Sequence, residues 1–237
     1  MMQEIKKFVV VSMARSGTNA LIAALRQHPN CYTDTELFHD KLIPRPHTAR
    51  MSLAERDADP LAFLHAVIAE AFERKPVITH YGFKIFFGQN DALLESLIKD
   101  PCWQVVLLRR ENSLDQFLSL KIALNTQVWN SREGDAAVKI HVDEQEFLDF
   151  KNEAEGLFNA CVVWLEKVDQ AYHNLDYSKV SAGDYGALCE FLGLAEPHDL
   201  VPKVKKQNPT RSADKVENPQ VVQAMLSREG LSHLWVD

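Results

Sequence analysis

The segment Ser12–Asn19, with the sequence SMARSGTN, combines residue types that bind negatively charged groups. It lies between an apolar run, Phe8–Val11, and apolar residues at helical spacing, so we expect a turn that joins a strand to a helix. Unpaired backbone N–H groups and the helix dipole favour an anion at such a turn. The segment also supplies hydroxyl groups, a forked guanidinium and a glycine that lets the backbone approach a ligand. The residues expected to bind the anion are Arg15, Ser16, Gly17, Thr18 and Asn19.

This turn differs from the phosphate-binding loop of ATPases and kinases, whose pattern is Gly-x-x-x-x-Gly-Lys-Ser/Thr. Ser12 stands at the position of the first glycine, and Thr18 stands at that of the lysine. The difference disfavours an ATPase or a kinase. Because Ser, Thr and Asn are common N-caps, the turn taken alone is equally well explained as an ordinary helix start.

A second group that suits phosphate follows a strand predicted at Trp103–Leu108. Arg110 comes just after the carboxyl end of this strand, and Ser119 lies nine residues further on in a predicted helix. Open α/β sheets bind ligands outside the carboxyl ends of their strands, so one ligand is able to contact both this edge and the first turn. Two anion sites indicate a ligand with two phosphate-like ends. Without that context, Arg109 and Arg110 would be interpreted as a solvated pair at a strand end.

Alternating strand and helix patterns position these two turns. The order predicts an α/β fold of three layers that resembles P-loop proteins, with a central, mainly parallel sheet flanked by helices, in a single domain over residues 1–237. Strands are expected at residues 8–11, 31–34, 77–87, 103–108 and 175–180. Helices are expected from the first turn to His28, and at residues 60–74, 91–99, 113–124, 146–173, 184–192 and 218–228, with a capping box from Ser113 to Gln116.

The composition excludes several classes of protein. A net charge of −7 disfavours an extended surface for nucleic acid, so any anion site must be local. The four cysteines are far apart and form no Cys-x-x-Cys pair, which argues against a zinc site or a disulfide framework and favours a cytoplasmic location. No cluster of His, Cys and carboxylate residues has metal-ligand spacing, so no metal is expected. No apolar stretch approaches the ~20 residues of a membrane span, so we expect a soluble protein.

The two phosphate-binding patterns together resemble the sulfotransferases that use 3′-phosphoadenosine 5′-phosphosulfate (PAPS). Residues 8–19 are similar to the loop of that family that binds the 5′-phosphosulfate, and residues 106–119 are similar to its 3′-phosphate motif, in which an Arg and a downstream Ser bind that phosphate. Arg15 is a departure, because many members carry Lys there. Three shorter segments resemble bacterial members, including carbohydrate sulfotransferases of the nodulation-factor type: residues 35–39, 82–84 and 206–209.

The resemblance implies one sulfotransferase-like domain that transfers a sulfuryl group from PAPS to a hydroxyl acceptor and releases adenosine 3′,5′-bisphosphate. The acceptor is a small molecule or a glycan, with carbohydrate favoured by the resemblance alone. Such a transfer needs positive charge on the leaving phosphate, which Arg15 and the loop N–H groups supply. It also needs a general base, for which Glu36, two residues past a predicted strand end, is the first choice and His39 the alternative.

Four further residues are candidates for contacts with the ligands. Lys84 is in reach of the transferring group, although a lysine on a strand usually points to solvent. Lys206 and Arg211 belong to a basic cluster that either closes over the 3′-phosphate or is simply a solvated loop. Trp129 offers a ring on which a sugar or an aromatic acceptor can stack, and the segments Thr35–Ser52 and Asn125–Glu144 are expected to line the acceptor pocket.

Two other functions remain open at this stage. A P-loop-type phosphotransferase would explain the first turn but leaves Arg110 and Ser119 without a role. A noncatalytic nucleotide-binding protein would bind the same ligand without transferring anything. The sequence identifies neither the acceptor nor the oligomeric state.

Overall fold

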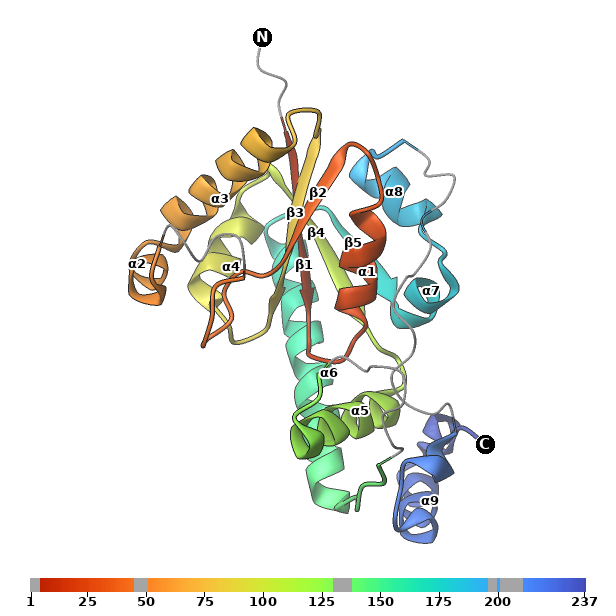
Figure 1. The fold of residues 1–237 in the computed structure, drawn as a ribbon. Helices are drawn as coiled ribbons and strands as arrows, with labels where there is room; N and C mark the ends of the chain where they lie inside the picture. Colours follow the sequence, from red (N-terminus) through yellow and green to blue (C-terminus); the bar gives the residue numbers. More distant parts are fainter. Residues whose placement is uncertain (1–4, 45–50, 130–137, 196–199, 201–210) are drawn as a thin grey trace. The chain divides into compact units, whose positions relative to one another are not determined.

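A computed structural model describes residues 5–44, 51–129, 138–195, 200 and 211–237 (Figure 1). The chain divides into two compact units. The first takes its described residues from Met1–Arg109 and Cys161–Lys203, and the second from Arg110–Ala160 and Val204–Asp237. Each unit has apolar core residues of its own, and a single domain over the whole chain stays a prediction.

The first unit is built on a five-stranded sheet in the order β2-β3-β1-β4-β5 (Figure 1). The strands are β1 (Lys6–Ser12), β2 (Cys31–Glu36), β3 (His80–Phe86), β4 (Trp103–Arg109) and β5 (Tyr172–Asp176). All four strand pairings are parallel. The chain builds β2 and β3 on one side of β1 and β4 and β5 on the other, so β1 lies where the direction of winding reverses. Ligands bind beside this point in open α/β sheets.

The strands are apolar on both sides because helices cover both faces of the sheet. Successive side chains of a strand point to opposite faces. Phe8 and Val10 of β1 accordingly pack with Leu21 and Leu188, whereas Val9 and Val11 pack with Phe63 and other residues of the opposite layer. The continuous apolar run in the sequence was therefore a sound indication of a buried parallel strand.

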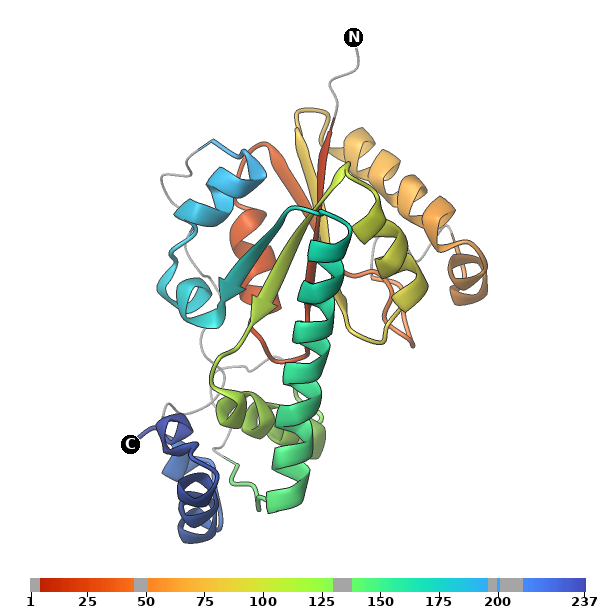
Figure 2. The ribbon, with the colours of Figure 1, turned by 180° about the vertical axis from the view of Figure 1, so that it is seen from behind.

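The helices form the outer two layers. One face of the sheet carries α1 (Thr18–Leu25), α7 (Tyr177–Ala182) and α8 (Gly186–Leu192), and the other carries α3 (Pro60–Arg74) and α4 (Asp91–Lys99), as Figures 1 and 2 show. A short helix, α2 (Leu53–Ala58), precedes α3. The predicted three-layer α/β fold is confirmed.

The second unit is helical. It contains α5 (Ser113–Thr126), the part of α6 (Glu144–Lys167) up to Ala160, α9 (Pro219–Arg228) and two short 3₁₀ helices, η2 (Ser212–Asp214) and η3 (Ser232–Leu234). Its core consists of apolar side chains from these helices, among them Leu114, Phe117, Phe147, Val222, Met225 and Leu234. A parallel bridge pairs Ile140 with Val216. Within the described residues no helix combines the length and apolar character needed to cross a membrane.

Several predicted boundaries were wrong for local reasons. The strand expected at residues 175–180 ends at Asp176, whose side chain accepts a hydrogen bond from the Ser178 N–H and so caps α7. The helix expected to reach His173 ends at Lys167, before Asp169 with its positive φ of 55°. The Ser113–Gln116 capping box is not used, because Asn112 caps α5 through the Asp115 N–H.

Candidate functional site

The first predicted turn joins β1 to α1, as expected, and Ser12 anchors it. The Ser12 hydroxyl donates a hydrogen bond to the Leu108 carbonyl at 2.7 Å, and the Ser12 carbonyl accepts one from the Phe87 N–H at 3.1 Å. The end of β1 is thereby tied to both neighbouring strands. Residues 13–17 form the turn, and α1 begins at Thr18.

The backbone of this turn is unusual at two positions. Arg15 has a φ of 66° and Gly17 a φ of 88°, both in the left-handed region that favours glycine. A Cβ atom on Gly17 would also lie 2.4 Å from the Tyr177 ring carbon Cδ2. Gly17 therefore meets two requirements, one of backbone conformation and one of packing. The sequence pattern predicted the close approach of a ligand but did not reveal the tyrosine, which comes from α7.

The start of α1 suits a phosphate or sulfate group. Its first turn contains no acidic residue, and Gly17 occupies the N-cap without a capping side chain. Ser16 and Thr18 are buried, whereas Asn19 is exposed. Arg15 lies close enough to Lys84 for its positive charge to add to the effect of burial, which lowers the pKa of Lys84. Negative charge is favoured at this turn, because the helix dipole and the nearby cations both attract it.

Lys84 is the buried centre of this region. A lysine on a strand usually points to solvent, but that interpretation is wrong here, because Lys84 is 1% exposed. Lys84 on β3 is in register with Val10 on β1, so its side chain points to the face covered by α1. Its Nζ donates to Thr18 Oγ1 at 3.2 Å and to Asn19 Oδ1 at 2.6 Å. Burial lowers the pKa of Lys84 below its ordinary value.

Glu36 is the ionic partner of Lys84. Its Oε1 atom lies 2.8 Å from Lys84 Nζ. Glu36 is the last residue of β2, rather than two residues beyond the strand as predicted. The pairing of β2 with β3 shifts between Thr33, which faces Gly82, and Glu36, which faces Lys84. This bulge supplies the extra residue that places Glu36, instead of its neighbour, beside Lys84.

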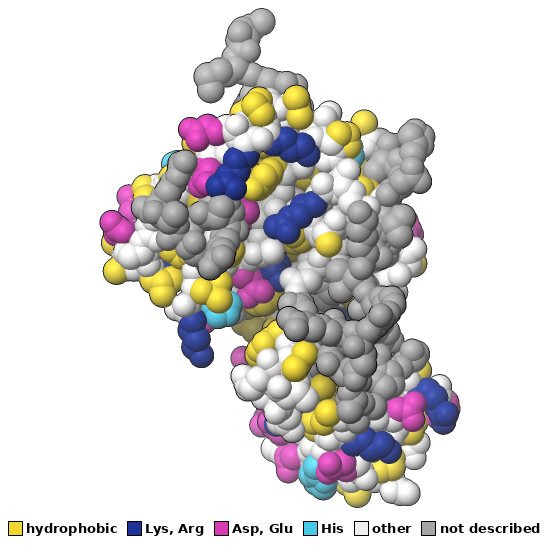
Figure 3. All heavy atoms as spheres, viewed as in Figure 1, with side chains coloured by type: hydrophobic (Ala, Val, Ile, Leu, Met, Phe, Trp, Pro, Cys, Tyr) yellow, Lys and Arg dark blue, Asp and Glu magenta, His cyan; other side chains and the backbone are white. Residues whose placement is uncertain are grey.

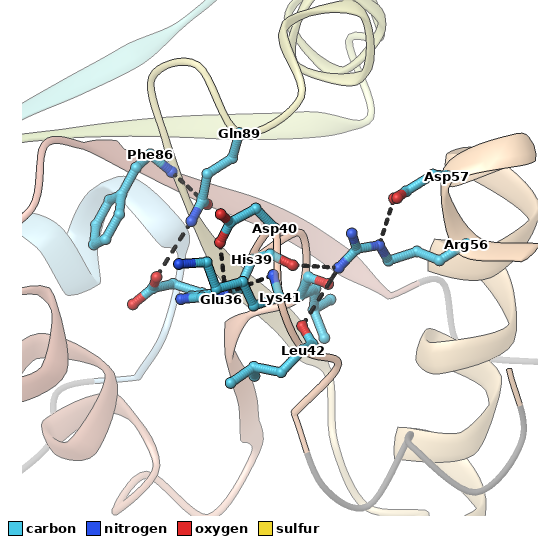
Figure 4. Close-up of polar contacts among 10 residues, drawn as sticks. Glu36, His39, Asp40, Lys41, Leu42, Arg56, Asp57, Phe86 and Gln89 are labelled. Carbon is cyan, nitrogen blue, oxygen red and sulfur yellow. Dashed lines mark hydrogen bonds and ion pairs between the residues drawn. The ribbon is translucent and has the colours of Figure 1, made fainter. Parts of the chain in front are cut away.

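Gln89 holds the second oxygen of Glu36 and was not found from the sequence (Figure 4). Its Nε2 donates to Glu36 Oε2 at 3.2 Å, and its Oε1 accepts from the Phe86 N–H at 2.9 Å. The amide is thus oriented by the turn that follows β3. No local pattern indicates this role, since it depends on the pairing of β2 with β3.

His39, the alternative base, has the described polar contacts of its side chain within its own loop. Its Nδ1 lies 3.0 Å from Asp40 Oδ1 and 3.1 Å from the Lys41 N (Figure 4). Its backbone carbonyl accepts a hydrogen bond from Arg56 Nη1 at 2.8 Å. Glu36 is directly bonded to Lys84 and Gln89, whereas His39 contacts neither through a hydrogen bond or ion pair that the structure describes.

Arg56, a buried residue of α2, fixes the loop that follows Glu36. Its guanidinium donates to the carbonyls of Leu37 at 3.1 Å and His39 at 2.8 Å, and it pairs with Asp57 at 2.7 Å (Figure 4). Buried carbonyl groups need such donors. The sequence did not reveal this role, although Ser52 and Glu55 form a capping box that marks the start of the helix carrying Arg56.

The second pair of predicted phosphate-binding residues lies in the second unit. Arg110 and Ser119 are both largely buried, and Arg110 Nη2 donates to Asp115 Oδ2 at 3.1 Å. The other oxygen of Asp115 pairs with the buried Lys215. Neither Asp115 nor Lys215 was predicted. Lys215 is distant in the sequence, and no motif connects either residue to Arg110.

The remaining predicted residues are exposed or lie outside the described residues. Trp129 and Arg211 are exposed, and Lys206 lies outside the described residues. On the face drawn in Figure 3, Lys and Arg side chains of the described residues form separate groups among apolar and acidic ones.

The fold of the chain is that of a known class of proteins, the sulfotransferases. The chain shares the fold of the sulfotransferase from Alicyclobacillus acidocaldarius, with a TM-score of 0.50 and 18% identity over 95% of each chain. Similarity in sequence is to Nodulation protein H. The Rhizobium tropici protein is 29% identical over 185 residues, which are 75% of this chain and 67% of that protein. The protein of Rhizobium meliloti strain 1021 is 28% identical over 133 residues, 55% of this chain.

These comparisons confirm the predicted resemblance to bacterial sulfotransferases, including those of the nodulation type. No family model matches the chain. The matched part spans about half the length of the R. meliloti protein, 52%, and two thirds of the R. tropici protein. The activity, donor and acceptor of this chain are therefore proposals.

Proposed function

We propose that this chain is a PAPS-dependent sulfotransferase that acts on the hydroxyl group of a small molecule or glycan, with a carbohydrate as the favoured acceptor. One observation carries the proposal: buried Lys84 contacts both the start of α1, through Thr18 and Asn19, and the carboxylate of Glu36. A group that binds anions and a group that can accept a proton are thus joined at the carboxyl ends of neighbouring strands.

The donor is held by groups of the chain at its two phosphate ends. Arg15 and the N–H groups that begin α1 bind the 5′ end, where their positive charge stabilises the negative charge of a leaving phosphate. Arg110 and Ser119 bind the 3′-phosphate, and Lys206 and Arg211 add positive charge. When bound, PAPS supplies the sulfuryl group. The motif in residues 106–119 supports the 3′ assignment through its resemblance to the family.

Glu36 is the proposed general base. Its carboxylate would take the proton of the acceptor hydroxyl and become a carboxylic acid, while the hydroxyl oxygen bonds to sulfur and the bond from sulfur to the 5′-phosphate oxygen breaks, which leaves adenosine 3′,5′-bisphosphate. Lys84 and Gln89 hold the two carboxylate oxygens in place. The exposed ring of Trp129 remains a candidate surface for the acceptor. His39 remains the alternative base.

A transfer assay tests this function. The chain is incubated with PAPS labelled on the sulfuryl group and a panel of glycans, lipids, phenols and small alcohols, and products are identified by mass. We expect one acceptor class to gain sulfate, with one adenosine 3′,5′-bisphosphate released per product. Binding of this nucleotide without transfer to any acceptor would support the noncatalytic alternative, and hydrolysis of Mg-ATP would support the phosphotransferase. A cytoplasmic location stays a prediction from the spacing of the cysteines.

A further inference from the structure

Three side chains of the second unit form a charged cluster, the Arg110–Asp115–Lys215 cluster. Asp115 uses one carboxylate oxygen for Arg110, at 3.1 Å from Nη2, and the other for Lys215 Nζ. The side chains are 9%, 9% and 2% exposed, respectively. Charges this well shielded from water interact strongly, and each is costly to bury without a partner.

The backbone fixes both partners of the Asp115–Lys215 pair. Asp115 lies in the first turn of α5, where its N–H donates to the Asn112 side chain at 2.8 Å. The Lys215 N–H donates to the Ser212 carbonyl at 3.0 Å, and its carbonyl accepts from the Ile140 N–H at 2.8 Å. The positions of the two charges are therefore set by the fold of this unit rather than by flexible side chains alone.

The charges of the cluster have a consequence for Arg110. An ion pair with Asp115 orients the guanidinium but also cancels its positive charge for any third group. Lys215 supplies a second cation to the same carboxylate, so the three residues together carry one net positive charge. A site that binds phosphate through Arg110 needs this excess charge.

We infer that Lys215 is a positioning residue for the 3′-phosphate: it neutralises Asp115, which orients Arg110, and so keeps these three side chains net positive towards the ligand. The inference rests on the proposed function of Arg110. Lys215 acts through Asp115 and is not required to touch the nucleotide.

The test is a double-mutant cycle on Asp115 and Lys215, in which the preference for a nucleotide with a 3′-phosphate is measured. Calorimetric titration measures the affinities of adenosine 3′,5′-bisphosphate and adenosine 5′-monophosphate, and their ratio isolates the 3′-phosphate from the rest of the nucleotide. The variants are Lys215→Met, Lys215→Arg, Asp115→Asn and the double variant Asp115→Asn/Lys215→Met, with Arg110→Ala as the reference. A merely misfolded variant would lose both ligands rather than the preference.

We expect Lys215→Met to lower the preference about tenfold and Lys215→Arg, which keeps the charge, to retain most of it. Asp115→Asn should raise the preference, and the double variant should match Asp115→Asn, because Lys215 then has no carboxylate to neutralise. If Lys215→Met does not fold, the comparison of Asp115→Asn with the double variant still tests whether Lys215 acts through Asp115, because both lack the carboxylate.

A lower preference in the double variant than in Asp115→Asn would overturn the inference, because Lys215 would then act on the ligand without Asp115. An unchanged preference in a folded Lys215→Met would overturn it as well. A different result would remove the proposed function of this site instead. If the wild type does not distinguish the two nucleotides, or if Arg110→Ala preserves the distinction, then Arg110 does not bind the 3′-phosphate, whatever Lys215 does.

Discussion

Each of the two units contains a buried lysine paired with a carboxylate, but the two pairs differ in how open the carboxylate is. In the first unit, the side chain of Lys84 is 2% exposed and that of its partner Glu36 is 24% exposed. In the second, the side chain of Lys215 is 2% exposed and that of Asp115 only 9%. A carboxylate that reaches solvent is able to exchange a proton with a substrate, whereas a sealed one is suited to holding another charge in place. The same chemical pair thus supports two different roles, which the following variants separate.

The largest expected effect comes from Glu36→Gln. Glutamine keeps the size of the side chain but accepts a proton poorly, so turnover should fall by about 10²–10⁴-fold. Affinity for adenosine 3′,5′-bisphosphate should stay unchanged, in contrast to Asp115→Asn, which changes affinity. Steady-state kinetics and calorimetry check the two halves of this contrast.

His39→Gln is the matched control for that experiment. It should leave turnover near the wild-type value, because His39 bonds within its own loop. If Glu36→Gln turned over normally while His39→Gln did not, the base would be His39 and the difference between the two lysine pairs would lose its functional meaning.

Gly17→Ala tests the loop that Lys84 contacts. Alanine at a φ of 88° costs roughly 1–2 kcal/mol, and its Cβ would lie 2.4 Å from the Tyr177 ring. We expect affinity for adenosine 3′,5′-bisphosphate to fall about tenfold or more. Adding Tyr177→Ala should restore only the part that comes from the clash.

The control for this substitution is Gly156→Ala. Gly156 lies inside α6, and a Cβ atom added there would have nothing within 4 Å, so alanine should be neutral or raise the free energy of unfolding by up to about 1 kcal/mol. Unchanged nucleotide affinity in Gly17→Ala would mean that the turn does not bind the ligand through its backbone.

Gln89→Ala tests how far the function of Glu36 depends on the hydrogen bond from Gln89 to its carboxylate. Losing one hydrogen bond to the Glu36 carboxylate should lower kcat roughly fivefold, with KM for PAPS unchanged. Gln145→Ala, which removes a bond of 2.8 Å to Asp149 on the surface of α6, should have no such effect. Equal kinetics in both variants would show that Gln89 does not position Glu36.

The sequence was informative where the signal is local. The phosphate loop, its flanking strand and helix, and the Arg110 to Ser119 spacing each occupy one short segment, and the continuous apolar run Phe8–Val11 predicts a buried strand. The three-layer fold followed from these segments. Local cues were less reliable at ends, where Asp176 caps a helix that the apolar pattern had assigned to a strand.

The parts of the candidate site that could not be predicted depend on pairing between distant segments. Glu36 meets Lys84 only because a bulge shifts the register of β2 against β3. Gln89 and Arg56 act on residues far from them in sequence, and Lys215 meets Asp115 across 100 positions. No spacing rule connects such residues, so the sequence offered candidate phosphate contacts, which stay predictions, without indicating which residues hold them in place.

The smallest expected effect concerns stability and the charge of Lys84. Burial lowers the pKa of this lysine below 10.5, so the unfolded chain binds its proton more tightly than the folded one. Stability therefore rises with pH as Lys84 loses its proton below 10.5. We expect the free energy of unfolding of the wild type to rise relative to that of Lys84→Met as the pH is raised from about 7.5 to about 9.5. Urea denaturation at several pH values measures this difference.

Lys179→Met is the control with the opposite sign. Lys179 is exposed and bonded to Asp184 at 2.7 Å, and this contact raises its pKa above 10.5. Its contribution is therefore complete below 10.5 and is lost only as the pH rises further, so the difference from the wild type should be flat between about pH 7.5 and pH 9.5. A flat difference for Lys84→Met as well would mean that its ammonium is not buried at a cost. Lys84 would then contact the start of α1 and Glu36 as a solvated lysine. The difference between the Lys84–Glu36 and Lys215–Asp115 pairs would not depend on burial.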